Sequence, residues 1–377
     1  MDKVLKELVG FRKELHQYPE VSQNETQTQK RIIQFLSNQE IQARKIGKTG
    51  VYVLFDSGID GKMIMLRSDH DALPIQEINN FEHKSTIEGV SHKCGHDGHT
   101  AIMCGVAKHF RENPIDRGRL LLLFQPAEEN GEGAKAVLND PNFDFRPDLV
   151  FAFHNLPGYP LRRVVVKEGS FNAAVKSIII ELNGKTAHAA EPEMGTNPAK
   201  TISELITMFD EENQPDIDRD DFALTTPVHV QLGEISYGVS AGHAQVHYTI
   251  RTWSSEMMYE LMDRLVNRID QICESNNIKN TIHWTEAFEA SKNDANAVQL
   301  IKSAAIENSL ALDERDRPFK WGEDFGLFTQ RFTGAMFGIG SGEECPALHN
   351  PDYDFPDGII ETGISMFVTI VKKAIDI

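Results

Sequence analysis

The sequence is poor in cysteine and contains no long apolar run. It does not predict a disulfide framework, because its 377 residues include only four, widely spaced cysteines: Cys94, Cys104, Cys273 and Cys345. No apolar stretch approaches the roughly 18 residues that a membrane-spanning helix needs. Residues 1–15 alternate charged and apolar side chains at helical spacing, so we expect no signal peptide. These features indicate a protein of the reducing cytoplasm.

Basic residues are also scarce relative to acidic ones. There are 38 Lys and Arg residues against 56 Asp and Glu residues, which gives a formal net charge of −18 at pH 7. A surface of this charge repels nucleic-acid phosphates and anionic lipid headgroups, so we expect neither a nucleic-acid partner nor a membrane partner. The chain is longer than one hydrophobic core usually serves, which predicts two domains.

Short apolar runs end at clusters of polar side chains. The runs lie at residues 62–67, 119–124, 149–153 and 335–339, and their length is typical of strands that are buried on both faces. Helical patterns such as residues 101–110 separate them, so the order predicts a mostly parallel sheet flanked by helices. Active sites of such sheets lie beyond the carboxyl ends of the strands, where the polar clusters occur here.

The middle of the chain has a different order of elements. The pattern predicts a strand, a helix, two strands, a helix and a strand at residues 174–182, 197–210, 227–235, 244–252, 254–275 and 280–288. This βαββαβ order is typical of the ferredoxin-like split motif. We therefore predict an α/β protein with a catalytic domain at residues 1–170 and 291–377 and an inserted ferredoxin-like domain at residues 171–290.

Residues 91–100 read SHKCGHDGHT and contain three histidines, one cysteine and one aspartate. Cys94 and His96 can face the same point if the backbone between them is extended, and thiolate with imidazole is a typical zinc pairing. The same spacing also occurs by chance. On this stretch alone, a metal site and a polar loop remain equally good interpretations.

Other segments supply further side chains of the metal-ligating types. The candidates are Asp69, Asp71, Cys94, His96, Glu128, Glu129, His154 and His349. A hydrolytic metal centre needs such ligands, an open position for water and a nearby base. Glu128 and Glu129 suit a division of these roles, because adjacent side chains at the end of a strand point apart. Taken alone, the pair is also compatible with a solvated loop.

Seven motifs in the chain occur in the order known from one family of enzymes. They are RSDHDALPI, HKCGHDGHTA, LLFQPAEE, FHNLP, GKTAHAAEPEMGTNP, GEDF and ALHNPDYDF. The chain resembles the M20 metallopeptidase superfamily over essentially its whole length. The match is closest to the amidohydrolase branch, which includes hippurate hydrolases, N-acyl-amino-acid deacylases and auxin-conjugate hydrolases.

The resemblance implies two divalent metal ions, most simply zinc, with cobalt, nickel or manganese as alternatives. By motif, the implied ligands are Cys94, His96, Glu129, His154 and His349. Glu128 would be the general base and acid that takes a proton from metal-activated water and returns it to the leaving amine. Asp71 would orient a ligand.

The resemblance also implies that residues 171–290 form a lid through which the chain forms a homodimer. His188 would stabilise the oxyanion, frequently in the active site of the partner subunit; without the resemblance it would read as a loop histidine that caps a turn. Asn197 and Arg251 are candidate substrate-binding residues. Asn197 is equally well explained as a helix N-cap, and Arg251 as a surface arginine.

These expectations lead to a metal-dependent amidase that acts on N-acyl amino acids or small conjugates. A metallo-dipeptidase or aminopeptidase with the same metals is the alternative, and a non-catalytic metabolite-binding protein is a third. Residues 234–242 depart from the family pattern in a region that helps to recognise the amino-acid carboxylate, so the resemblance does not define the substrate.

Overall fold

The computed structural model describes residues 3–375, and the chain divides into two compact units. Unit 2 comprises Asn172–Ala290 and Arg317–Gly322, and unit 1 comprises the rest. The expected domain boundaries differ from these units at Phe171 and at residues 317–322. The latter segment belongs to unit 2 because Phe319 forms a β-bridge with Asn172 and its carbonyl accepts a 2.8 Å hydrogen bond from the backbone N–H of Ala173.

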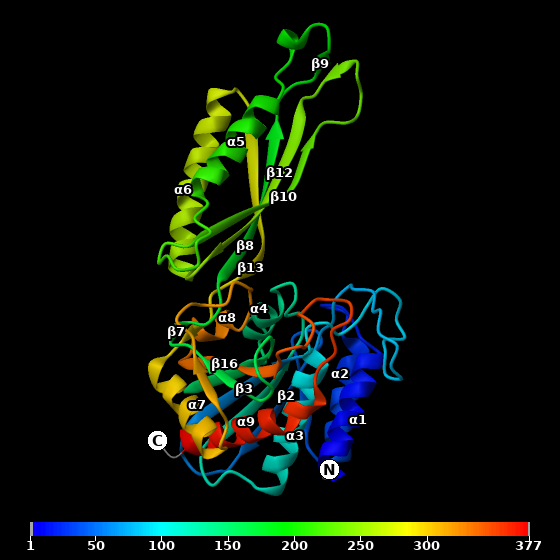
Figure 1. Ribbon diagram of the computed structural model, residues 1–377, viewed down its shortest axis with the longest axis vertical. Helices are drawn as coiled ribbons and strands as arrows, with labels where there is room; N and C mark the ends of the chain where they lie inside the picture. The colour runs from blue at the N-terminus through cyan, green and yellow to red at the C-terminus, as the bar shows by residue number, and fades with distance from the viewer. Residues whose placement is uncertain (1–2, 376–377) are drawn as a thin grey trace. The chain divides into compact units, whose positions relative to one another are not determined.

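Unit 1 is built on a mixed sheet (Figure 1), and the expected α/β class is confirmed. In order across the sheet, its strands are β1 (Ala43–Ile46), β2 (Gly50–Asp56), β4 (Arg119–Gln125), β3 (Met63–Asp69), β5 (Leu149–Pro157), β16 (Gly334–Gly342), β6 (Val164–Val166) and β15 (Leu312–Glu314). The adjacent strands β4, β3, β5 and β16 are mutually parallel, whereas the pairings β1–β2, β2–β4 and β16–β6 are antiparallel. A run of four parallel strands therefore occupies the centre of the sheet, and a second parallel pair, β6–β15, lies at one edge.

Helices cover this sheet and complete one hydrophobic core. They are α1 (Lys3–Gln17), α2 (Thr26–Asn38), α3 (His96–Glu112), α7 (Ala295–Glu307) and α9 (Ile360–Ile375), with the short η2 (Asp357–Ile359). Unit 1 also contains the short helices α4 (Gly133–Leu138) and α8 (Gly326–Thr329). Helix α3 is buried along most of its length. A Cβ at Gly105 would lie 2.3 Å from a side-chain atom of Ile364 on α9, so the small residue allows these helices to pack closely.

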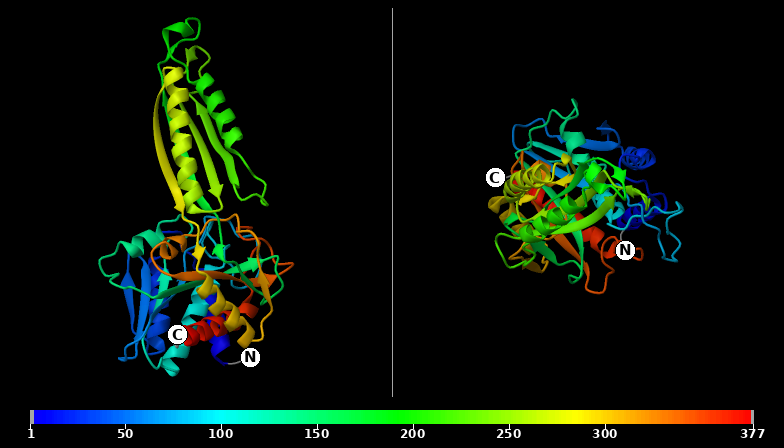
Figure 2. Two further views of the ribbon diagram at one scale, coloured as in Figure 1. Left: turned by 90° about the vertical axis from the view of Figure 1, so that its left-hand side faces the viewer. Right: turned by 90° about the horizontal axis from the view of Figure 1, so that it is seen from above.

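Unit 2 contains an antiparallel sheet with the strand order β10 (Ala223–Leu232), β12 (His243–Thr252), β8 (Ala174–Asn183) and β13 (Lys279–Phe288). Helices α5 (Ala199–Glu212) and α6 (Ser255–Ser275) lie side by side on one face of it (Figure 2). Their order along the chain is βαββαβ, as predicted. Alternate apolar residues of β8 and β12 pack against the two helices in a second core.

One predicted strand of unit 2 was misplaced. Strand β10 begins at Ala223, not at Pro227, and passes through Pro227 with an irregular register between Pro227 and His229. Proline lacks a backbone N–H and is therefore tolerated mainly in edge strands and bulges. Because β10 is an edge strand, Pro227 interrupts the pairing without ending the strand.

Two short pairings complete the description. Strand β7 (Gly169–Ser170) pairs with β14 (Lys292–Asn293), and β9 (Ala187–His188), which precedes the short helix η1 (Pro192–Met194), pairs with β11 (Val239–Ser240). None of the helices within residues 3–375 is both long and apolar enough to cross a membrane.

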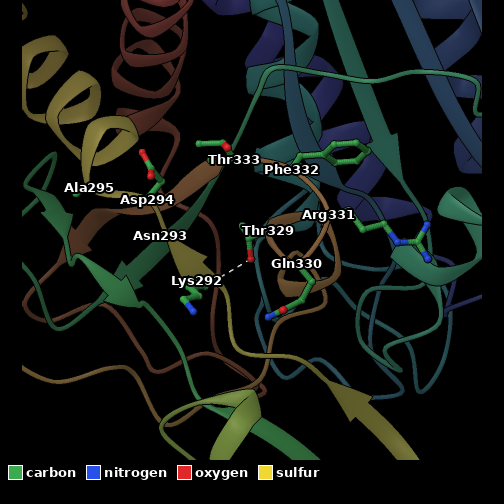
Figure 3. A pocket seen from close by; sticks show the side chains of 10 residues that line it. Lys292, Asn293, Asp294, Ala295, Thr329, Gln330, Arg331, Phe332 and Thr333 are labelled. Carbon is green, nitrogen blue, oxygen red and sulfur yellow. Dashed lines mark hydrogen bonds between the residues drawn. The ribbon is translucent and has the colours of Figure 1, made fainter.

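A pocket of about 440 Å³ lies in unit 1 beside the start of α7 (Figure 3). Its lining includes Lys292, whose backbone N–H donates to Thr329 Oγ1 at 3.0 Å, and Arg331. The Asp294 side chain accepts a 3.0 Å hydrogen bond from the Ala297 N–H and thus caps the helix itself. None of the residues described as lining this pocket is a predicted site residue, so it is separate from the candidate site.

The close contact between β16 and β5 leads to a stability prediction. A Cβ at Gly334 would lie 2.0 Å from the carbonyl oxygen of Val150, so Gly334→Ala should destabilise unit 1 by about 1–3 kcal/mol. Gly10→Ala in α1 is the matched control: a Cβ there meets nothing within 4 Å, and the change should stabilise the helix by about 0.5–1 kcal/mol.

Urea unfolding followed by circular dichroism measures both effects. Tryptophan fluorescence reports unit 2 separately, because all three tryptophans, Trp253, Trp284 and Trp321, lie there. An unchanged unit 1 transition in Gly334→Ala would show that the β16–β5 contact relaxes without cost.

Candidate metal centre

The parallel centre of the sheet brings distant segments to one edge. Asp69 ends β3, Glu128 and Glu129 follow β4, and His349 lies in the loop after β16. The carboxyl ends of these parallel strands lie along the same edge of the sheet. His154 lies within β5 and not after it, because β5 continues to Pro157 in register with β16 and pairs His154 with Gly338.

The SHKCGHDGHT segment is a turn that opens a helix. Gly95 has a φ of 98° and His96 is the first residue of α3, so a turn and not an extended backbone brings Cys94 and His96 together. A Cβ at Gly95 would lie 2.7 Å from Asn155 Oδ1 and 2.9 Å from the Tyr353 hydroxyl. Glycine is thus required here both for the left-handed backbone and for space.

All five predicted ligands lie close together with Glu128. The Cys94 thiol lies 3.5 Å from His154 Nε2, and His349 Nε2 lies 3.5 Å from Glu129 Oε2. Three overlapping groups have ligand atoms within 4.8 Å of one another: Cys94, His96 and His154; Cys94, Glu129 and His349; and His96, Glu128 and Glu129. Sulfur, nitrogen and oxygen donors therefore surround one small region of unit 1.

Two atoms at the centre of this region lack a hydrogen-bond partner. His96 Nε2 and Glu129 Oε1 lie 3.8 Å apart, both are buried, and neither makes a hydrogen bond. A buried polar atom without a partner costs about 1–3 kcal/mol. A divalent cation bound by both atoms would satisfy them, so the residues present fit a metal ion.

Asp71 positions two of the candidate ligands. Its Oδ1 accepts a 3.1 Å hydrogen bond from His96 Nδ1, which leaves Nε2 directed at the glutamates. Its Oδ2 accepts from the backbone N–H of Glu129 at 3.0 Å and from Ser22 Oγ at 2.7 Å. A carboxylate that holds the second ring nitrogen is a common partner of a metal-binding histidine.

Glu128 and Glu129 were expected to point apart, and they do so only in part. Both approach His96 Nε2, at 3.9 Å for Glu128 Oε2 and 3.8 Å for Glu129 Oε1. On its other side Glu128 faces Glu323 and Asp324, whereas Glu129 faces Cys94 and His349. The preceding Ala127 has a φ of 51°, a left-handed conformation that costs roughly 1–2 kcal/mol in a residue with a Cβ.

A buried arginine that sequence reasoning missed supports this side of the site. Arg67 is fully buried and its guanidinium contacts Asp69 at 2.5 Å and Glu323 and Asp324 at 2.7 Å each. Asp324 also accepts a 2.8 Å hydrogen bond from Gln125 Nε2. Arg67 was treated as the end of an apolar run; a charge inside a buried strand was the signal that it needs buried partners.

The His349 loop is held by a second missed residue. His349 has a φ of 65°, and its backbone N–H donates to the carbonyl oxygen of Lys93 at 2.7 Å. The buried Lys93 ammonium contacts Glu77 at 2.5 Å and the carbonyl oxygen of Tyr353 at 2.7 Å. Lys93 therefore connects the loop to the segment that carries Cys94, although the His349 side chain itself is 51% exposed.

Burial and neighbouring charges decide which groups hold protons in the metal-free chain. Burial and the adjacent carboxylates raise the pKa of the Cys94 thiol and of Glu128 well above their usual values. Burial also raises the pKa of Glu129 to about 8, although His96 opposes the change. Burial lowers the pKa of His96, but Asp69 and Asp71 outweigh it and raise the value to about 10. Three of the five candidate ligands, Cys94, His96 and Glu129, are thus shifted toward their protonated forms, whereas burial lowers the pKa of His154 and His349.

Three predicted residues belong to unit 2, whereas the ligand cluster is built entirely from unit 1. His188 lies in β9, is exposed, and accepts a 3.0 Å hydrogen bond at Nδ1 from the backbone N–H of Ala190. Asn197 donates to Ser240 Oγ at 3.1 Å and accepts from the Ala199 N–H at 2.9 Å. Arg251 donates to the carbonyl oxygen of Lys320 at 2.7 Å. Each of these contacts is local to unit 2.

Known proteins match the chain along nearly its whole length. Residues 65–373 match the model of peptidase family M20/M25/M40. The chain belongs to this family. It is therefore a hydrolase, and the resemblance drawn from the seven motifs is confirmed.

Individual members of the family are similar to this chain over most of their own length. An N-acetyl-L-cysteine deacetylase of Bacillus subtilis (strain 168) is 32% identical over 375 residues, which cover 98% of this chain and 89% of that protein. An N-acetyldiaminopimelate deacetylase of Geobacillus sp. (strain WCH70) is 31% identical over 371 residues and 96% of each chain. The crystal structure of a Bacillus subtilis protein described as a dinuclear metal binding peptidase superposes with a TM-score of 0.85 at 26% identity, covering 100% of this chain and 99% of that one.

The protonation of the cluster leads to a prediction about metal binding. Because a cation must displace protons from groups such as Glu129, whose pKa is about 8, binding should release protons and the apparent affinity should rise from about pH 6 to about pH 9. Calorimetry of zinc binding in buffers with different ionisation enthalpies measures the number of protons released. Glu129→Gln should lower that number, and an affinity independent of pH would contradict the assignment of these residues as ligands.

Proposed function

We propose that this M20 family member is a metal-dependent amidohydrolase that releases the acyl group from N-acyl amino acids or related small conjugates. The observation that carries the proposal is the approach of Glu128 and Glu129 to the unpartnered Nε2 of His96. The two deacetylases among the similar proteins support an N-acylated amino acid as the substrate class.

The proposed cofactor is a pair of divalent metal ions held by Cys94, His96, Glu129, His154 and His349. The overlapping ligand groups and the dinuclear relative support two ions. Thiolate and imidazole donors favour zinc. Cobalt, nickel and manganese are alternatives, because the geometry of the site and the availability of each metal also decide which ion is bound. When bound, such ions acidify water and polarise the carbonyl of a substrate.

Glu128 is proposed as the general base and acid. Its carboxylate lies beside the ligand cluster, is buried, and faces Glu323 and Asp324, which help to raise its pKa. A carboxyl group with a raised pKa accepts and returns a proton near neutral pH more effectively than an ordinary glutamate. Glu128 would take a proton from the attacking water and pass it to the leaving amine. Asp71 would keep His96 in the orientation that the site requires.

Unit 2 is proposed to act as the lid and to form a homodimer. Its edge strand β10 exposes Val228, Val230 and Leu232, and an unpaired apolar edge is a ready surface for a second copy. His188 would stabilise the oxyanion of the reaction, either in its own chain or, across such a dimer, in the active site of the partner subunit. Asn197 and Arg251 would contribute to binding the carboxylate of the amino acid.

Two alternative functions have less support than the amidohydrolase. A dipeptidase or aminopeptidase needs a group that holds a free ammonium, and the similar deacetylases favour an acylated amine instead. A purely binding protein would need no base, whereas Glu128 is present and buried.

We place the protein in the cytoplasm because its four cysteines are free and a thiolate ligand requires reduced Cys94. The charge of −18 disfavours nucleic-acid and membrane partners.

Turnover of a panel of N-acetyl amino acids, with the matching dipeptides as controls, tests the substrate class. Glu128→Gln should keep its metal and lose about 10²- to 10⁴-fold in kcat, because the proton transfer loses its group. Free amino acid is quantified before and after chelation of the metal. Full turnover by metal-loaded Glu128→Gln, or preference for the free amine, would overturn the proposed chemistry.

His188→Ala should lower kcat by about 10²- to 10³-fold at unchanged metal content, because an oxyanion-stabilising group has been removed. If His188 acts across a dimer, mixing His188→Ala with Glu128→Gln chains should restore about a quarter of the activity, since half of the dimers then contain one complete site. Loss of metal from His188→Ala would contradict its role. No recovery in a mixture shown to contain mixed dimers would exclude action across the dimer.

A further inference from the structure

The segment after α1 contains a buried carboxylate that none of the proposed steps uses. Glu25 is 0% exposed and lies immediately before α2. Its side chain makes no capping hydrogen bond to that helix. Instead, Oε1 accepts from the backbone N–H groups of Ala127 at 2.8 Å and of Gln23 at 2.9 Å, and Oε2 accepts from Thr49 Oγ1 at 2.7 Å. The carboxylate is therefore directed at the turn that follows β4.

Ala127 is the residue of that turn whose conformation needs support. Its φ of 51° lies in the left-handed region, which L-residues with a Cβ rarely adopt. The next two residues are Glu128 and Glu129, so the direction of both side chains depends on the backbone at Ala127. The hydrogen bond from the Ala127 N–H to Glu25 holds the peptide group that leads into this residue.

The same segment supports the turn at a second point. Ser22 Oγ donates to Asp71 Oδ2 at 2.7 Å, and that oxygen accepts the N–H of Glu129 at 3.0 Å. Residues 22–25 therefore contact the turn at both ends, once directly through Glu25 and once through Asp71. Ionised carboxylates that accept backbone N–H groups make stronger hydrogen bonds than neutral acceptors do.

We propose that Glu25 is a positioning residue for the metal centre: its carboxylate holds Ala127 in the left-handed conformation that directs Glu128 and Glu129 at His96. Glu25 acts on the reaction only through this turn and touches neither metal nor substrate. The inference deepens the proposed function, because it concerns the groups assigned there as base and ligand.

Glu25→Gln is the first variant. The amide keeps the shape of the side chain but loses the negative charge and one acceptor oxygen. Its NH₂ group faces either the backbone N–H groups of Ala127 and Gln23 or the Thr49 hydroxyl, which must then accept. Direct partners of metal ligands typically contribute 10- to 100-fold, and Glu25 acts on Glu129 through the turn, so we expect zinc affinity and kcat to fall by about tenfold. KM should change little, since no substrate contact is lost.

Glu20→Gln is the matched control within the same segment. Glu20 Oε2 accepts from the backbone N–H groups of Gln27 and Thr28, at 2.8 and 2.7 Å, and thus supports the start of α2 and not the turn. Its loss should lower the unfolding midpoint while zinc affinity and kcat stay at wild-type values. A purely structural role of Glu25 would make the two variants behave alike.

Rescue provides the specific readout. Glycine adopts the left-handed region without a steric penalty, so Ala127→Gly should restore a large part of the zinc affinity and kcat lost in Glu25→Gln. The same change added to Glu20→Gln should have no such effect. If Glu25→Gln does not fold, Thr49→Val carries the test: it removes one contact of Glu25 and should weaken zinc binding about threefold or more.

Zinc affinity is measured by competition with a chromophoric chelator, so this arm decides the inference even if the wild-type protein hydrolyses no N-acyl amino acid. Wild-type zinc affinity and kcat in folded Glu25→Gln, or in Thr49→Val if only that variant folds, would overturn the proposal. Failure of Ala127→Gly to restore either quantity would overturn it as well. A wild-type protein that binds zinc but lacks amidase activity would instead count against the proposed function alone.

Discussion

The candidate site depends on how one buried imidazole is oriented. His96 is held through Nδ1 by Asp71, and this contact directs Nε2 toward Glu128 and Glu129. Asp71 in turn accepts the backbone N–H of Glu129, so a single carboxylate fixes a histidine and a glutamate relative to each other. Without it, the imidazole of His96 and the peptide group of Glu129 would lose the hydrogen-bond partner that they share. The rest of unit 1 brings this arrangement to the edge of the sheet and keeps water from most of it.

The central strands and the βαββαβ order of unit 2 could be predicted from the sequence. Runs such as RLLLLF are buried on both faces, and alternation in β8 and β12 marks one covered face. The outer strands β6 and β15 are only three residues long and carry little periodic signal. The position of β16 between β5 and β6 depends on pairings between residues far apart in the chain, which no local pattern encodes.

The candidate site also combines features that a local sequence pattern reveals with features that depend on distant residues. That Cys94, His96 and His349 lie in one cluster could be predicted, because their side chains have the chemistry of metal ligands. The partners of Arg67 and Glu25 could not, because a buried charge does not by itself indicate which residue pairs with it: Arg67 binds Asp324, which is 257 residues away. The turn at Gly95 was also missed, since the need for a left-handed glycine arises from Asn155 and Tyr353, which pack against it.

The placement of β16 has a consequence for how the chain is made. Unit 1 is discontinuous: β5 precedes unit 2 in the sequence, and β16, its neighbour in the sheet, follows it. During synthesis, all four strands of the unit 2 sheet leave the ribosome before β16 does, so that sheet can form while β5 still has an open edge. An exposed apolar edge of this kind is prone to pair with other chains. The nascent protein therefore passes through a stage in which its metal-binding half is still incomplete.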